Sequence, residues 1–227
     1  MKNITDIFFD LDHTLWDFDA NSILAFDKIF ATHHPTIDTN TFIEIYEPIN
    51  QACWKLYQVD KITHEELRYT RLKQSFDVLN YTISDKEIDT ISHLYIEFMP
   101  DNNRLFDGAI EVLEYLYLKY NLHIITNGFA EVQGKKITKS GLGNYFKTIT
   151  NSELAGMKKP HATIFEYALS LANVKKENAI MIGDCIDADV RGAINFGMKA
   201  ILFDEKGIYA AEGLHTINHL LELKKIL

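Results

Sequence analysis

Ile7-Phe8-Phe9-Asp10-Leu11-Asp12-His13-Thr14-Leu15 is the stretch of this sequence that decides the fold. Its apolar, β-favouring start predicts a buried strand in a parallel sheet that is covered on both faces. Asp10 and Asp12 then fall at or just past the carboxyl end of that strand, where open α/β sheets bind ligands. Because side chains two residues apart on a strand share a face, the two carboxylates should converge. Such close negative charges repel unless a cation or a proton intervenes, which indicates a chemical site.

A structural alternative exists for these two aspartates. An Asp that follows a strand often only forms a turn or caps a helix. A chemical role therefore depends on what the other strand ends contribute.

Composition narrows the class of protein and of partner. The 227 residues include 23 Lys and Arg against 32 Asp and Glu, giving a net charge of −9. Because no basic stripe is available to neutralise phosphates, we expect no nucleic-acid polymer as a partner. Two cysteines suit a reducing compartment, and no signal peptide or membrane-length apolar stretch is recognisable. We expect a cytoplasmic protein without membrane association, whose oligomeric state the sequence leaves unknown.

Two patterns alternate along the chain. Residues 21–99 carry amphipathic helical spacing and two capping boxes, whereas the remainder alternates apolar strands with helices. The predicted fold class is α/β, with a doubly wound parallel five-stranded Rossmann-like core and an inserted α-helical cap domain. We assign residues 1–15 and 104–227 to the core and residues 16–103 to the cap. The predicted strands are residues 7–9, 122–126, 146–149, 179–182 and 200–203, and a last helix is expected over residues 216–226.

Polar groups recur where these strands end. Right-handed crossovers bring the carboxyl ends of parallel strands to one edge of the sheet. The groups expected there are Asp10 and Asp12, Thr126-Asn127, Gly183-Asp184, and Lys159, which precedes a helix. Each group alone has an ordinary structural explanation as turn or surface chemistry. Their joint occurrence at successive strand ends and a helix start favours a single composite site.

The chemistry of that composite site favours magnesium and phosphate. Carboxylates, waters and a substrate oxygen are the hard ligands that Mg²⁺ prefers, whereas Zn²⁺ is disfavoured because no His/Cys cluster accompanies the acids. An ammonium, a threonine hydroxyl and strand-end amides match the remaining oxygens of a phosphate dianion. The sequence therefore predicts a Mg²⁺-assisted site for a small phosphorylated substrate.

These motifs resemble those of the haloacid dehalogenase (HAD) superfamily of phosphohydrolases, in order and in spacing, over essentially the whole chain. The helical cap also falls where that family inserts one. One departure is His13, at a position where many members carry Gly and which mainly contributes backbone. The matching motifs are Asp10-Leu11-Asp12-His13-Thr14-Leu15, Thr126-Asn127-Gly128, Lys159-Pro160 and Gly183-Asp184-Cys185-Ile186-Asp187-Ala188-Asp189.

The resemblance implies a role for each matching residue. Asp10 would be the nucleophile that forms an aspartyl-phosphate, and Asp12 would be the general acid and then the general base. Asp10, the backbone carbonyl of Asp12, and Asp184 would hold Mg²⁺. Phosphoryl oxygens would be bound by Thr126, the amide of Asn127, and Lys159. Asp189 would support Lys159 or a metal-bound water.

Substrate choice is expected to depend on the cap and on Trp16-Asp17-Phe18-Asp19. The aromatics there could stack on a base, or they could simply pack the cap hinge. The first motif with its extension to Phe18, together with Ile125-Thr126-Asn127-Gly128-Phe129, resembles the pyrimidine 5′-nucleotidase branch. That resemblance implies a nucleoside monophosphate as substrate.

Other functions stay open at this level. Phosphoglycolate, a small sugar phosphate or a phosphomutase reaction are the enzymatic alternatives, and a catalytically silent HAD-like binding scaffold is the non-enzymatic one. A silent scaffold would be expected to lose at least one of Asp10, Asp12, Lys159 or Asp184, and all four are present.

Overall fold

The structure is a computed structural model that describes residues 3–209 and 213–227. The chain divides into two compact units: Met1–Phe18 with Asn103–Leu227, and Asp19–Asn102. The assignment of the second unit as a cap domain remains a proposal. Within the described residues, no helix combines the length and the apolar character needed to cross a membrane.

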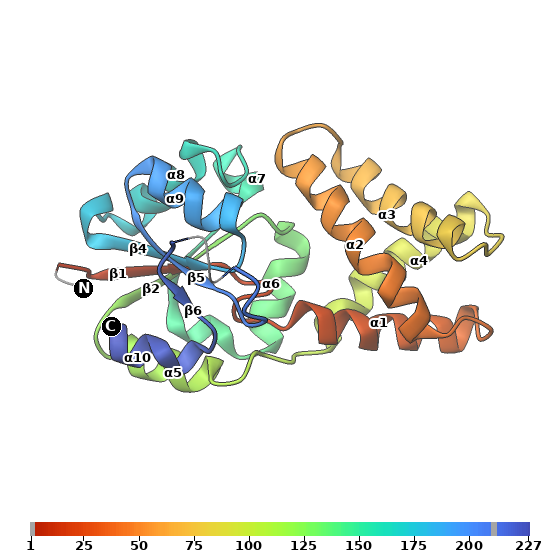
Figure 1. The fold of residues 1–227 in the computed structure, drawn as a ribbon, viewed down its shortest axis with the longest axis horizontal. Helices are drawn as coiled ribbons and strands as arrows, with labels where there is room; N and C mark the ends of the chain where they lie inside the picture. Colours follow the sequence, from red (N-terminus) through yellow and green to blue (C-terminus); the bar gives the residue numbers. More distant parts are fainter. Residues whose placement is uncertain (1–2, 210–212) are drawn as a thin grey trace. The chain divides into compact units, whose positions relative to one another are not determined.

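The first unit is built on a six-stranded, wholly parallel sheet (Figure 1). Its strand order is β3-β2-β1-β4-β5-β6. All five strands predicted from the sequence are present, which confirms the α/β fold class. The strands are β1 (Asp6–Phe9), β2 (Asn121–Thr126), β3 (Phe146–Asn151), β4 (Ala179–Gly183), β5 (Lys199–Phe203) and β6 (Thr216–Ile217).

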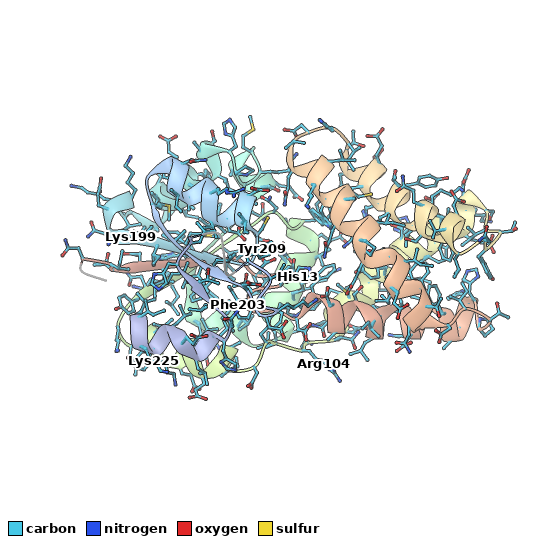
Figure 2. The ribbon with its side chains drawn as sticks, viewed as in Figure 1. His13, Arg104, Lys199, Phe203, Tyr209 and Lys225 are labelled. Atoms are coloured by element: carbon cyan, nitrogen blue, oxygen red, sulfur yellow. The ribbon has the colours of Figure 1, made fainter. Side chains whose placement is uncertain are left out.

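The central position of β1 explains its unbroken apolar run. β1 pairs with β2 on one side and β4 on the other, and all four of its residues are buried. Because all strands are parallel, their carboxyl ends share one edge of the sheet. His13, just past the end of β1, lies near that edge, while Lys199 at the start of β5 lies at the opposite end (Figure 2).

The C-terminal prediction was partly wrong. A single helix was expected over residues 216–226, but Thr216 and Ile217 form the edge strand β6. Backbone bonds from Leu202 N to His215 O and from Asp204 N to Ile217 O, each 2.8 Å, tie this segment to β5. Thr216 and Ile217, both β-branched, therefore pair with the edge of β5 as a strand. Helical structure starts only after them, with a 3₁₀ turn and α10 (Leu223–Ile226).

Helices cover both faces of the sheet (Figure 1). α8 and α9 lie on one side, and α5 and α10 lie on the other. α8 buries Ile164, Phe165, Ala168 and Leu169 against Phe8 and Met181, because these helical positions form one apolar stripe. The other α-helices of this unit are α5 (Ala109–Tyr117), α6 (Ala130–Lys139), α7 (Ser152–Ala155), α8 (Ala162–Ala172) and α9 (Gly192–Phe196). Short 3₁₀ segments occur at Leu142–Tyr145, Lys176–Asn178 and Leu220–Glu222, and a π-helical segment occurs at Ile186–Arg191, whereas the 3₁₀ turn Met99–Asp101 belongs to the second unit.

The second unit contains the predicted helical pattern. Both capping boxes are formed, with Thr63 bonded to Glu66 and Ser84 bonded to Glu87. A cluster of stacked and edge-on rings centred on Phe26 fills its interior. Its elements are α2 (Thr39–Gln58), α3 (His64–Val78), α4 (Asp85–Phe98) and α1 (Phe18–His33), whose first residue belongs to the first unit.

Candidate active site

Backbone hydrogen bonds fix the conformation of the segment that follows β1. Asp10 continues the sheet, donating its N–H to Ile182 O at 2.9 Å, and both Leu15 and Trp16 donate to Leu11 O. His13 has a φ of 60°, in the left-handed region where L-residues are uncommon and Gly is at ease. This backbone conformation suits glycine, which is the residue that the resemblance led us to expect at this position.

Lys159 connects the end of β1 with the segment after β4. Its Nζ lies 2.8 Å from Asp10 Oδ1 and 2.6 Å from Asp189 Oδ1. It also donates to the carbonyl of Ile125 at 2.8 Å. The side chain is 2% exposed, so the ammonium is held where these partners fix it. Of the two roles that the sequence left open for Asp189, the structure contains the contact with Lys159.

Asn127 fixes the backbone of Lys159. Asn127 Nδ2 donates to Lys159 O at 2.9 Å, and Lys159 N donates to Asn127 Oδ1 at 2.7 Å. The sequence had assigned only the backbone amide of Asn127, to a phosphoryl oxygen. The reciprocal side-chain bonds add a structural function, because they lock the loop that carries the ammonium to the loop that follows β2.

Three carboxylates form a compact acidic cluster. Ligand atoms of Asp10, Asp184 and Asp189 all lie within 4.8 Å of one another. Thr14 Oγ1 donates to Asp184 Oδ1 at 3.2 Å. These all-oxygen donors fit Mg²⁺, which takes hard ligands and keeps several of its waters. The metal role predicted for Asp12 concerns its backbone carbonyl, and its side chain is not part of this cluster.

Electrostatics in the cluster favour a bound cation. Burial raises the pKa of Asp10 to about 7, and the carboxylates of Asp189 and Asp12 add to the effect while Lys159 opposes it. Burial and the charges of Asp189 and Asp10 also raise the pKa of Asp184. Burial alone would lower the pKa of Lys159, but the charges of Asp10 and Asp189 raise it above its ordinary value. A protonated lysine beside three carboxylates leaves excess negative charge, which a divalent cation would relieve.

Asp12 is held by two residues that the sequence analysis missed. Lys136 Nζ lies 2.6 Å from Asp12 Oδ1, and Gln133 Nε2 donates to Asp12 Oδ2 at 2.9 Å. Both belong to α6, which follows β2 and its Thr126-Asn127 end. The available signal was their spacing of three residues, which puts two polar side chains on the face of α6 that turns inward.

Trp16 and Phe18 lie in the first unit and are largely buried. Trp16 is 0% exposed and Phe18 is 9% exposed, and the two rings pack edge to face. Lys136 Nζ lies 4.1 Å from the centroid of the Trp16 ring. Of the two interpretations of these aromatics, the packing role fits this burial, because Trp16 presents no open face to a base.

A family model of haloacid dehalogenase-like hydrolases matches residues 7–203. This range includes all five predicted strands and every candidate site residue. The chain belongs to the haloacid dehalogenase-like hydrolase family.

Similar proteins agree with this assignment over nearly the whole chain. A crystal structure of the HAD-hydrolase YfnB from Bacillus subtilis, described as bound to magnesium, is 29% identical with a TM-score of 0.89, covering 100% of this chain and 99% of that one. The pyrimidine 5′-nucleotidase YjjG of Escherichia coli K12 is 30% identical over 97% of this chain and 96% of its own length. A glyceraldehyde 3-phosphate phosphatase of Pyrococcus furiosus is 33% identical over 92% and 84%, respectively.

Proposed function

We propose that this HAD-family hydrolase is a Mg²⁺-dependent phosphomonoester hydrolase that acts through an aspartyl-phosphate on Asp10. The observation that carries the proposal is the grouping around Asp10. One carboxylate has a buried ammonium 2.8 Å away and two further acids within 4.8 Å. A phosphoryl dianion would take the place of some of these contacts and accept hydrogen bonds from the Lys159 ammonium and the Thr126 hydroxyl.

Asp10 and Asp12 would divide the chemistry. A carboxylate oxygen of Asp10 attacks phosphorus while the bond from phosphorus to the leaving alcohol breaks. Asp12, in its protonated form, gives its proton to the leaving oxygen. The resulting Asp12 carboxylate then takes a proton from the water that attacks phosphorus, and the bond to Asp10 breaks. Inorganic phosphate leaves, and Asp12 is protonated again.

The metal site would be made by Asp10, Asp184 and the backbone carbonyl of Asp12. A bound Mg²⁺ would neutralise phosphoryl charge and orient the phosphoryl group. Lys159 is held toward Asp10 by Asp189 and by the carbonyl of Ile125, so its ammonium is in place before substrate arrives. The amide of Asn127 and the hydroxyl of Thr126 would complete the phosphoryl contacts.

We infer that the substrate is a nucleoside 5′-monophosphate with a pyrimidine base. Support comes from the similarity to the YjjG nucleotidase over 97% of this chain. The 33% identity to a glyceraldehyde 3-phosphate phosphatase favours a small sugar phosphate as the second candidate. The substrate is in either case a small phosphate ester.

A phosphatase screen tests both levels of this proposal. Purified protein with Mg²⁺ is offered pyrimidine and purine nucleoside monophosphates, phosphoglycolate, triose and hexose phosphates, and an aryl phosphate. We expect release of inorganic phosphate that chelator and Asp10→Asn abolish.

Activity that survives either treatment would overturn the mechanism, and isomerised phosphate ester in place of free phosphate would indicate a mutase. If no nucleotide ranks among the best substrates, the nucleotidase assignment is wrong and the phosphatase assignment stands. No turnover of any ester would favour the binding scaffold.

A further inference from the structure

The carboxylate of Asp12 is held from both sides by one helix. Lys136 Nζ lies 2.6 Å from Oδ1, and Gln133 Nε2 lies 2.9 Å from Oδ2. Gln133 is 1% exposed and Lys136 is 2% exposed, so neither contact is a surface pair that solvent would screen. Each carboxylate oxygen therefore has a donor that fixes its position.

The orientation of the Gln133 amide follows from its neighbours. Nε2 donates both to Asp12 Oδ2 and to Thr126 Oγ1, the latter at 2.7 Å. A reversed amide would aim Oε1 at the Asp12 carboxylate, placing two acceptors against each other. In the observed orientation both N–H groups are used, while the buried Oε1 has no hydrogen-bond partner among the described residues. Leaving the buried Oε1 without a hydrogen bond costs free energy, and in this orientation the two N–H groups donate to Asp12 and Thr126.

Gln133 also sets the direction in which Thr126 can donate. Thr126 Oγ1 accepts from Gln133 Nε2 at 2.7 Å and from Gly128 N at 3.0 Å. A hydroxyl oxygen has two lone pairs, so both acceptor positions are occupied and the proton is left to donate. This is the arrangement that a phosphoryl oxygen needs from Thr126 in the proposed function.

Gly128 lies so close to the Gln133 amide that only a residue without a side chain fits there. A Cβ at position 128 would lie 2.1 Å from Gln133 Nε2 and 2.5 Å from its Cδ. Any larger residue would displace the Gln133 side chain from Asp12 and Thr126. The glycine of the Thr126-Asn127-Gly128 motif thus leaves the space that Gln133 occupies.

Lys136 is fixed on the side away from Asp12 by aromatic rings. Its Nζ lies 4.1 Å from the centroid of Trp16 and 5.1 Å from that of Phe18. A cation over a ring face is attracted by the ring quadrupole, most strongly where water is excluded. The ammonium is therefore placed by the segment just after the first motif as well as by α6.

We propose that Gln133 and Lys136 are positioning residues that hold the Asp12 carboxylate in place for proton transfer to and from the leaving group. The inference rests on the proposed function, since it assigns Asp12 the proton. Lys136 would stabilise the negative charge that remains on Asp12 once the leaving oxygen has taken that proton. Gln133 would couple the same carboxylate to the phosphoryl-binding hydroxyl of Thr126.

Dependence on the leaving group separates this role from a structural one. An aryl phosphate whose phenol is a good leaving group needs little protonation, whereas an alkyl or nucleoside ester needs it fully. We would measure kcat/KM, which reports on the first irreversible step, for a series of phosphate esters of rising leaving-group pKa. The variants are Lys136→Met, which removes the ammonium but keeps an unbranched apolar side chain that can pack near Trp16, and Gln133→Leu. The matched control is Lys135→Met on the same helix, because Lys135 is half exposed and pairs only with Glu131 in the described contacts.

The expected result is a steeper dependence in both variants. Losses should be within about threefold for the best leaving group and grow to about a hundredfold for the poorest, with Lys135→Met following the wild type. In an Asp12→Asn background, Lys136→Met should add less than about twofold, because residues that act as a unit are not additive. Equal losses across the series, or a loss that multiplies with that of Asp12→Asn, would overturn the proposal.

Failure of the inference is distinguishable from failure of the proposed function. If the Asp10→Asn variant is as active as the wild type, the proposed mechanism itself is wrong. Activity that Asp10→Asn abolishes, combined with parallel leaving-group slopes, overturns only the positioning role. If thermal melting finds Lys136→Met unfolded, Lys136→Arg and Gln133→Asn move the same donors without removing them. Those two variants should also steepen the series, and wild-type slopes in both would refute the role.

Discussion

The ammonium of Lys159 lies 2.6 Å from the carboxylate of Asp189, and both side chains are almost wholly buried, at 2% and 1% exposure. Asp189 also accepts from Cys185 N at 3.0 Å, so the carboxylate is anchored to the loop after β4. Lys159 in turn contacts Asp10 at the end of β1. One buried ion-pair chain thus fixes the relative position of two strand ends of the first unit.

Loss of the Lys159 ammonium should destabilise the protein. Lys159→Met leaves Asp10 and Asp189 buried without their cation, and removing one partner of a buried pair costs about 3–5 kcal/mol. Denaturant unfolding in the absence of Mg²⁺ measures the change in the free energy of unfolding. Lys158→Met, one residue earlier in the chain, is the control and should lose less than about 1 kcal/mol. Equal stability of the two variants would contradict the assigned role of the pair.

Mg²⁺ should stabilise the wild-type protein through the acidic cluster. A ligand that binds only the folded state adds about 2.7 kcal/mol at a hundredfold excess over Kd. Thermal melting with Mg²⁺ and with chelator should therefore separate for the wild type, and Asp184→Asn should remove most of that difference. Asp187→Asn alters an exposed carboxylate of the same motif, paired with Arg191, and should behave as the wild type. A Mg²⁺ shift that survives Asp184→Asn would refute this cluster as the metal site.

Gly183 should not tolerate a side chain. A Cβ there would lie 2.3 Å from Asp189 Oδ2 and 2.4 Å from its Cγ. Gly183→Ala should therefore push Asp189 away from Lys159 and Cys185, costing about 2 kcal/mol or more of unfolding free energy. Gly134→Ala is the matched control, because nothing lies within 4 Å of that Cβ and alanine is the better helix former by about 1 kcal/mol. Opposite signs in denaturant unfolding are expected, and a neutral Gly183→Ala would count against the packing argument.

Acidification should destabilise the fold through His123. The ring is 1% exposed, with Nε2 3.0 Å from Asp6 Oδ1 and Nδ1 2.8 Å from Thr148 Oγ1. Burial lowers its pKa from 6.5, although Asp6 opposes the effect. The unfolded chain therefore binds more protons below that pH, so this contribution to stability is complete above pH 6.5 and lost as pH falls below it.

The comparison for His123 is a variant that cannot titrate. In His123→Gln, the decline of unfolding free energy between neutral pH and about pH 5 should be shallower than in the wild type, even if the variant is less stable at neutral pH. Denaturant unfolding across that range measures both slopes. Identical slopes would mean that another group controls the acid side.

Much of the core could be predicted because its signals are local. Apolar runs such as Ile7–Phe9 have no exposed face and are too short for a helix, so they predict buried parallel strands, and all five were found. The Thr63 and Ser84 capping boxes are likewise local, since each involves residues three apart. The prediction of a helix at the C-terminal segment was wrong because Thr216 and Ile217 pair with β5. That strand is distant in the sequence, so a local pattern does not reveal the pairing.

The sequence by itself determined which acids and which lysine we propose for the site, and in which order the five predicted core strands follow one another along the chain. Short-range hydrophobic patterning decides where a parallel strand ends, and a polar residue there faces the common edge. Only the tertiary structure decided that Gln133 and Lys136 hold Asp12, that Asp189 pairs with Lys159, and that Trp16 is buried. These contacts join residues as many as 124 positions apart. Helical periodicity says which side chains share a face, but packing alone decides what that face meets.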